Sequence, residues 1–261
     1  MRPGGPPAAR GTVHLVGAGP GDPGLLTLRG ARLLETCSFV AYDRLVASEL
    51  LDLAPPDAVR LDVGKRPGGG GWTQEEIERL LTAAARGGHA VVRLKGGDPF
   101  VLGRGGEEAV ACVEAGIPFE VVPGITSAVA APAAAGIPVT HRGIATGFAV
   151  VTGHEDPTKP EHQNDWAALA AFPGTLVVLM GVGNLAAITE RLIANGRDPA
   201  TPAAAVRWGT TPQQEVVEAP LGVLPTAVAQ RGLRPPATIV VGDVVGMRAV
   251  LAETPALVGA A

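Results

Sequence analysis

The sequence places charged side chains directly after several apolar or glycine-rich segments. The cations in these positions are Arg44, Lys65, Arg104 and Arg142. Each charge taken singly is more often a solvated surface group than a ligand contact. Taken together, they place cations at strand ends in a chain whose formal net charge is -4. Because arginine pairs with a carboxylate through two parallel hydrogen bonds, this arrangement suits a small polyanionic substrate.

A glycine-rich loop, Gly17–Gly24, follows the first apolar run and invites a dinucleotide-binding interpretation, with Asp43 in the position that binds a ribose. Three details weigh against this alternative. Asp22 stands where the motif needs its third glycine, and its carboxylate would repel a pyrophosphate. Pro20 and Pro23 also remove amide donors that a phosphate would use. We therefore favour a ligand without phosphates over a nicotinamide cofactor.

A second glycine cluster, Lys95–Phe100, follows the apolar run Ala90–Leu94. Two glycines directly after a strand let a ligand touch the backbone with no Cβ in the way. Asp98 has two interpretations: it accepts hydrogen bonds from a ligand, or it caps the following turn, which is the commoner fate of Asp before Pro. Arg104 stands between glycines, where a structural arginine gains little packing, and this favours a functional role for it.

Composition excludes several classes of protein. The chain has 261 residues, 46% of them hydrophobic, and no apolar run reaches the ~20 residues that a membrane span requires. The first ten residues lack the apolar core of a signal peptide, so a cytoplasmic protein is expected. Net charge and 3% aromatics argue against nucleic-acid binding. Cys37 and Cys112 are too far apart for a CxxC pair and are expected to be buried, with no metal site.

Short β-branched runs alternate with helical patterns, which predicts α/β layering. The expected strands are 12–16, 38–42, 59–63, 90–94, 118–122, 148–152, 175–179, 203–207, 214–218 and 238–242. A helix is expected from Thr73, which forms a capping box with Glu76, and an alanine-rich helix follows Gly124. We predict two α/β domains, 11–124 and 125–248, with a ligand cleft between them, a disordered tail at 1–10 and a C-terminal tail at 249–261.

A series of sequence blocks in a fixed order carries a family resemblance. The blocks are Val16–Thr27 (VGAGPGDPGLLT), Tyr42–Val46 (YDRLV), Val63–Arg66 (VGKR), Arg93–Glu108 (RLKGGDPFVLGRGGEE), Val122–Ser127 (VPGITS), Gly136–Arg142 (GIPVTHR), Thr152–His154 (TGH), Leu179–Gly181 (LMG), Gly209–Thr211 (GTT) and Ala237–Gly242 (ATIVVG). Together they resemble the tetrapyrrole methylase family, and within it the enzymes that methylate uroporphyrinogen III. The resemblance runs from about Gly11 to Met247.

This resemblance implies a two-domain α/β fold, a homodimer and S-adenosylmethionine bound in the cleft between the domains. The implied reaction is two successive C-methylations of uroporphyrinogen III, which give precorrin-2 and S-adenosylhomocysteine on a route to sirohaem, cobalamin or related haems. Carried over by motif, the cofactor contacts are Pro20, Gly96, Gly97, Asp98, Val101, Thr126, Ser127, Met180, Gly209, Ala237 and Thr238.

The family's proton acceptor and donor match Asp43 and Lys65, while Arg104, Glu107 and Arg142 match residues that contact or help to deprotonate the tetrapyrrole. Uroporphyrinogen carries eight carboxylates, which explains a need for these cations and for Arg44. Methylation of a ring carbon leaves a positive charge and a proton to be lost. Asp43 or Glu107 could accept that proton, and the sequence does not choose between them.

The sequence departs from the family pattern at two places, and three alternative functions stay open. The loop after Arg66 and Gly143 both differ from the family pattern, and both positions lie in loops that the resemblance places toward the substrate. The alternatives are a methylase acting on a later corrinoid intermediate, a nicotinamide-dependent oxidoreductase, and a protein that binds tetrapyrroles or the cofactor without catalysis.

Overall fold

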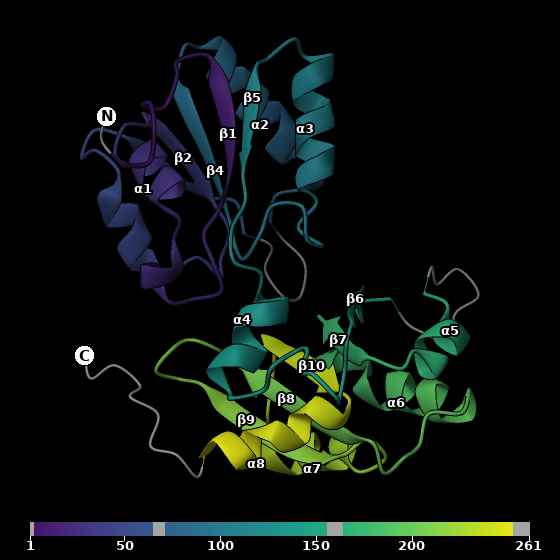
Figure 1. Ribbon diagram of the computed structural model, residues 1–261. Helices are drawn as coiled ribbons and strands as arrows, with labels where there is room; N and C mark the ends of the chain where they lie inside the picture. The colour runs from purple at the N-terminus through teal and green to yellow at the C-terminus, as the bar shows by residue number, and fades with distance from the viewer. Residues whose placement is uncertain (1–2, 65–70, 156–163, 253–261) are drawn as a thin grey trace. The chain divides into compact units, whose positions relative to one another are not determined.

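A computed structural model of the chain describes residues 3–64, 71–155 and 164–252. Its elements form two compact units, Met1–Thr126 and Ser127–Ala261, and each unit contains one five-stranded sheet (Figure 1). Every strand expected from the sequence is present, with bounds that differ by at most two residues. The α/β class is therefore confirmed.

The first unit is built on a parallel sheet in the order β3-β2-β4-β1-β5. Its strands are β1 (Thr12–Gly17), β2 (Phe39–Tyr42), β3 (Val59–Asp62), β4 (Ala90–Lys95) and β5 (Phe119–Val122). Because all five strands run in the same direction, the loops that follow them meet at one edge of the sheet, where ligands bind in open α/β sheets. β4 lies at the centre and is buried at every position.

Two layers of helix cover this sheet. The connections β1 to β2 and β2 to β3 move across the sheet in one direction, and the connections β3 to β4 and β4 to β5 move in the other. Right-handed crossovers therefore put the two groups of helices on opposite faces. One group comprises η1 (Pro23–Leu25), α1 (Leu28–Leu34) and η2 (Ser48–Leu53); the other comprises α2 (Gln74–Arg86) and α3 (Gly105–Glu114).

The side chains at the two faces match this arrangement. Leu33 of α1 packs with Val16 and Val40, whereas Ile77 of α2 belongs to the cluster around Leu15. The predicted capping box is confirmed, because Glu76 N donates to Thr73 Oγ1 and Thr73 N donates to Glu76 Oε2.

Both cysteines lie in these cores, as the sequence predicts. Cys37 is on the α1 face and Cys112 is on the α3 face, and both are buried free thiols. Burial raises the pKa of each thiol to about 11, so little reactive thiolate forms at neutral pH.

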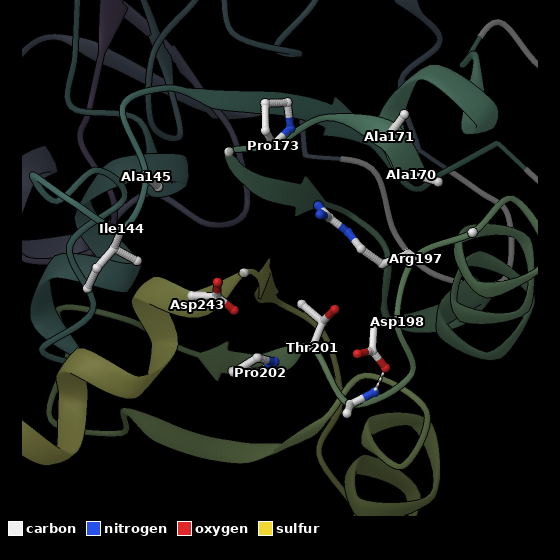
Figure 2. Close-up of a pocket in the computed structure, with 14 residues that line it drawn as sticks. Ile144, Ala145, Ala170, Ala171, Pro173, Arg197, Asp198, Thr201, Pro202 and Asp243 are labelled. Carbon is white, nitrogen blue, oxygen red and sulfur yellow. Dashed lines mark hydrogen bonds between the residues drawn. The ribbon is translucent and has the colours of Figure 1, made fainter.

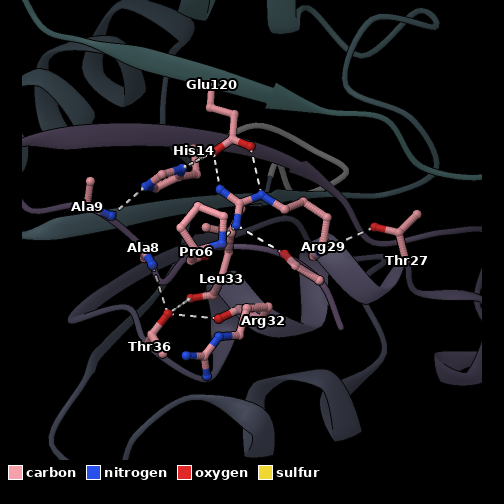
Figure 3. A network of polar contacts seen from close by, with 12 residues as sticks. Pro6, Ala8, Ala9, His14, Thr27, Arg29, Arg32, Leu33, Thr36 and Glu120 are labelled. Atoms are coloured by element: carbon pink, nitrogen blue, oxygen red, sulfur yellow. Dashed lines mark hydrogen bonds and ion pairs between the residues drawn. The ribbon is translucent and has the colours of Figure 1, made fainter. Parts of the chain in front are cut away.

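The segment before β1 differs from the predicted disordered tail, because residues 3–10 are held against the first unit (Figure 3). Arg29 on α1 donates to the carbonyl oxygens of Gly4 and Pro6, and Ala8 N donates to Thr36 Oγ1 over 2.9 Å. Ala9 N donates to His14 Nε2 over 3.1 Å. These partners lie up to 28 residues along the chain, which is why composition alone did not indicate them.

His14 is buried in the middle of this network. Its Nδ1 lies 2.9 Å from Glu120 Oε2, and Glu120 also accepts two hydrogen bonds from Arg29. Because Ala9 N donates to Nε2, the neutral ring carries its proton on Nδ1. Burial lowers the pKa of His14 below its ordinary value of 6.5, although Glu120 opposes the shift.

Stability should therefore fall as the pH falls through 6.5. Below that pH the unfolded chain takes up a proton that folded His14 does not bind, so the free energy of unfolding drops by at most about 1.4 kcal/mol per pH unit until the folded group titrates. We expect His14→Gln to flatten the slope of unfolding free energy between pH 7 and 5.5, measured by urea titration. Exposed His154→Gln is the control, and an unchanged slope in His14→Gln contradicts the prediction.

The second unit has a mixed sheet in the order β6-β7-β10-β8-β9. Its strands are β6 (Phe148–Thr152), β7 (Thr175–Leu179), β8 (Pro202–Arg207), β9 (Glu215–Pro220) and β10 (Ala237–Val241). β6 pairs with β7 in parallel, and the other pairs are antiparallel. β7 and β8 both run against β10, so the ends of β7 and β8 and the start of β10 share one edge.

Helices cover both faces of this sheet as well. They are α4 (Ser127–Ala134), α5 (Trp166–Ala171), η3 (Val182–Asn184), α6 (Leu185–Ala194), α7 (Leu224–Arg231), η4 (Asp243–Gly246) and α8 (Met247–Ala252). Ala203 and Ala205 of β8 face the core under α5, α6 and α7, and Ala204 and Val206 face α4 and η4. Helix α8 continues to Ala252, four residues into the predicted C-terminal tail. Among the described residues, no helix is long and apolar enough to span a bilayer.

Candidate functional site

The loops that follow β1 and β4 are joined backbone to backbone. Ala18 N donates to Lys95 O over 2.7 Å, Gly19 N donates to Gly97 O over 3.2 Å, and Gly97 N donates to Gly19 O over 2.7 Å. Since the amides of Ala18 and Gly19 are occupied, they are not available to a pyrophosphate. In addition, β4 separates β1 from β2, whereas the dinucleotide-binding fold places its first strand beside its second. Both observations argue against the nicotinamide alternative.

Asp98 fastens this pair of loops to a third. One carboxylate oxygen accepts from Phe100 N and Val101 N, and the other accepts from Gly124 N over 3.0 Å. The turn-capping interpretation of Asp98 is therefore what the structure shows, and a contact of Asp98 with cofactor stays a prediction. Gly96, by contrast, has open space above it: a Cβ built there would meet nothing closer than Leu45 Cβ at 3.8 Å.

Asp43 follows β2 and is tied to the central strand. Its backbone N donates to Leu94 O over 3.1 Å, and Arg93 Nη2 donates to its Oδ1 over 2.5 Å. The Asp43 side chain is 32% exposed, so an incoming substrate can reach it. A carboxylate held in this way at the end of a parallel strand is placed to accept a proton.

Three residues that the sequence analysis did not single out for the site lie directly behind Asp43. Arg93, Lys95 and Glu108 are each at most 2% exposed, and Glu108 Oε1 accepts from Arg93 Nε over 2.9 Å and from Lys95 Nζ over 3.0 Å. A signal was present: Arg93 and Lys95 alternate in an apolar strand and so point to one face. Glu108 shares the helix face of Cys112, four residues on, which is also buried.

The two predicted site residues at the start of α3 face outward. Arg104 and Glu107 pair with each other through two hydrogen bonds of 2.8 and 2.6 Å, and both side chains are about half exposed. Arg104 precedes the helix with a left-handed φ of 57°, which is uncommon for a side-chain-bearing residue. Thus the GGEE motif directs Glu107 to solvent and its neighbour Glu108 to the buried network.

The remaining predicted substrate contacts lie on exposed loops. Arg44 is exposed after β2, and Arg142 is exposed in a turn where Ile144 N donates to His141 O over 3.0 Å. Gly143 occupies the third position of that turn with φ +83°, the left-handed conformation that glycine adopts most readily. Turn geometry therefore accounts for glycine at this departure from the family pattern. Lys65 lies outside the described residues, as does most of the other departure.

In the second unit, predicted cofactor residues gather at the shared edge of β7, β8 and β10. Met180 follows β7, Gly209 follows β8, and Ala237 and Thr238 begin β10, where Thr238 pairs with Leu179 and Ala237 pairs with Arg207. Thr238 Oγ1 donates to Ser127 O over 3.5 Å, which brings the start of α4 to the same edge.

Backbone strain is concentrated at this edge. Met180, Trp208 and Thr210 have φ values of 58°, 47° and 74°, a region that costs a non-glycine residue of order 1–3 kcal/mol. Met180 is also 51% exposed. Residues held in such conformations at strand ends commonly belong to ligand sites.

Three other predicted cofactor residues occupy the loops of the first unit. Pro20 is half-buried after β1, Val101 is half-buried in the turn that Asp98 caps, and Thr126 is half-buried just before α4. Their contacts with a cofactor stay predictions.

A pocket of about 520 Å³ lies elsewhere, at the opposite edge of the second sheet (Figure 2). Gly174 before β7, Pro202 at the start of β8 and Gly242 after β10 line it. Two of its charged side chains bond to the surrounding loops: Arg197 Nη1 donates to Phe172 O, and Asp198 accepts from Ala200 N. None of the predicted site residues within the described part of the chain lines this pocket, so we assign it no role in the chemistry. The described ranges also contain no cluster of three potential metal ligands.

The fold and these motifs define a known class of protein. A family model described as tetrapyrrole (corrin/porphyrin) methylases matches residues 12–225. The chain belongs to this family.

Individual relatives are similar over nearly the whole chain. An S-adenosyl-L-methionine-dependent uroporphyrinogen III methyltransferase of Methanosarcina barkeri is 49% identical over 243 residues, 93% of this chain and 95% of the relative. A crystal structure of uroporphyrin-III C-methyl transferase from Thermus thermophilus, complexed with S-adenyl homocysteine, has a TM-score of 0.76 at 47% identity and covers 90% of this chain and 99% of that one. A cobalt precorrin-4 methyltransferase has a TM-score of 0.80 at 29% identity, covering 90% and 96%.

Proposed function

We propose that this protein transfers methyl groups from S-adenosylmethionine to two carbons of uroporphyrinogen III, forming precorrin-2 for sirohaem or cobalamin synthesis. The observation that carries the proposal is the 49% identity, over 93% of the chain, to an S-adenosylmethionine-dependent uroporphyrinogen III methyltransferase. The precorrin-4 methyltransferase is more distant at 29%, which favours uroporphyrinogen III over a later corrinoid.

The residues present fit a cofactor that carries no phosphate. The open backbone at Gly96 lets a ligand approach the chain closely, while the amides of Ala18 and Gly19 are already paired. The left-handed conformations of Met180 and Thr210 support a ligand role for the loops of the second unit that carry them. We therefore propose that the two glycine-rich loops of the first unit hold S-adenosylmethionine, and the cofactor contacts expected near Thr238 stay predictions.

The chain's own residues would align the substrate and remove its proton. The bound cofactor supplies an electrophilic methyl group, so that a C–C bond forms at the ring carbon as the S–C bond breaks. Asp43 stabilises the positive charge left on the macrocycle and accepts the proton that restores a neutral ring. Arg44, Lys65, Arg104 and Arg142 pair with substrate carboxylates.

Arg104 is expected to act in docking rather than in the chemical step. Its bond to Glu107 is an exposed ion pair, which contributes little by itself and can be exchanged for a substrate carboxylate. We expect Arg104→Gln to raise KM for uroporphyrinogen about 3–10-fold with little change in kcat. Added salt should raise KM of the unaltered enzyme more than KM of the variant, because screening removes the same attraction. A fall in kcat at unchanged KM contradicts a docking role.

The decisive test is turnover under anaerobic conditions. Uroporphyrinogen III and S-adenosylmethionine are expected to give precorrin-2 and two equivalents of S-adenosylhomocysteine, measured by absorbance and chromatography. Binding of both ligands without product would indicate a protein that only sequesters them, and turnover of a later corrinoid alone would indicate another methylase. A homodimer in the cytoplasm stays a prediction, and the mass of the protein in solution tests the dimer.

A further inference from the structure

Four charged side chains form a continuous chain of ion pairs at the end of the central strand of the first unit. Arg93 and Lys95 contribute two cations, and Asp43 and Glu108 contribute two carboxylates. Glu108 Oε1 lies 2.9 Å from Arg93 Nε and 3.0 Å from Lys95 Nζ, and Arg93 Nη2 reaches Asp43 Oδ1. The formal charges balance, which makes burial of three of the four side chains tolerable.

Arg93 is the centre of this network and is held from several directions. Besides the two carboxylates, its Nη1 donates to Leu94 O over 3.3 Å and to Ala41 O over 3.5 Å. A guanidinium is a rigid planar fork, so bonds at Nε and Nη1 fix the direction in which Nη2 points. The orientation of the Asp43 carboxylate is therefore set by residues on β4 and α3.

Stability alone is a poor reason for such a network. A buried ion pair is often no more stabilising than apolar side chains of the same volume, because the charges lose their hydration. That loss is apparent at Lys95, whose pKa is lowered by burial and by the neighbouring Arg93. The member that is not buried, Asp43, is the one at the strand end.

We propose that Arg93, braced by Glu108 and Lys95, is a positioning residue that holds one oxygen of the Asp43 carboxylate and so orients the proton acceptor toward the substrate. This inference rests on the proposed function. Its chemical logic is that proton transfer depends steeply on donor–acceptor geometry, so a carboxylate held on one side acts more efficiently than one that rotates freely.

A double-mutant cycle with Asp43 tests the proposal. We expect Arg93→Gln to lower kcat about 10–100-fold while the Kd for S-adenosylmethionine and the KM for uroporphyrinogen change by less than about threefold. In an Asp43→Asn background, Arg93→Gln should lower kcat no further, because the group that it orients is already gone. Equal losses of kcat in both backgrounds would overturn the proposal.

A matched control and a second variant complete the test. Arg29→Gln removes another arginine that forms two bonds to a carboxylate, that of Glu120, in the same unit. It should reduce stability and leave kcat unchanged. If Arg93→Gln does not fold, Arg93→Lys keeps the charge without the fork and should show the same loss and the same non-additivity. An unaltered protein that does not turn over uroporphyrinogen refutes the proposed function, whereas additive losses in an active enzyme refute only the role of Arg93.

Discussion

Replacing Asp43 with asparagine is expected to lower kcat by about 10²–10⁴-fold, the range that general acid–base catalysis contributes. Asparagine keeps the size of the side chain and an oxygen that can accept from Arg93 Nη2, but it cannot take up the proton. Because Asp43 belongs to the β2 loop and not to the proposed cofactor loops, the Kd for S-adenosylmethionine should change by less than about twofold. Single-turnover release of S-adenosylhomocysteine and calorimetric titration of the cofactor measure the two quantities.

Two comparisons make this result interpretable. Asp52→Asn alters an exposed carboxylate on η2 and should leave both quantities unchanged. Glu107→Gln tests the other carboxylate that could accept the proton. Since Glu107 is on the surface and paired with Arg104, its loss should affect KM more than kcat. Full turnover by Asp43→Asn, with Glu107→Gln inactive, would reverse the assignment.

Local signals in the sequence were sufficient to predict the helices and strands and the loops that follow them. The apolar run 90–94 marks a strand and is followed within two residues by two glycines, and the helix from Gln74 begins with a capping box and is followed by Gly87. Both signals depend on residues within one turn or one strand of each other. The charge directly after the second strand identified Asp43 as a candidate, and the glycines on either side of Arg104 identified that residue.

The order of the strands in the sheet and the ion-pair partners of the charged side chains could not be predicted from local signals. The apolar runs do not indicate that β4 lies between β1 and β2. This strand order brings Arg93 beside Asp43, which is 50 residues earlier in the sequence. Likewise, His14 and Glu120 meet because β1 pairs with β5, across 106 residues of sequence.

The second large effect is expected from adding one methyl group at Gly124. A Cβ built there would lie 2.2 Å from Gly97 O and 2.7 Å from Gly17 Cα, and both obstacles are backbone atoms that cannot rotate away. The loops after β1, β4 and β5 would have to separate, and the bond from Gly124 N to Asp98 would be strained. We expect Gly124→Ala to lower the free energy of unfolding by about 1–3 kcal/mol or more.

The same displacement should weaken binding of S-adenosylmethionine at least about tenfold, because the proposed contacts at Gly96 and Gly97 lie on the loop that must move. Gly106→Ala provides the matched control in the same unit: its Cβ would meet no atom within 4 Å, and alanine in α3 should raise stability by up to about 1 kcal/mol. Urea unfolding and calorimetric titration of the cofactor separate the two variants. If Gly124→Ala has the same free energy of unfolding and the same Kd for S-adenosylmethionine as the unaltered protein, close contact of the three loops does not shape the cofactor site. The proposal that the cofactor lies against exposed backbone at these strand ends would then be wrong.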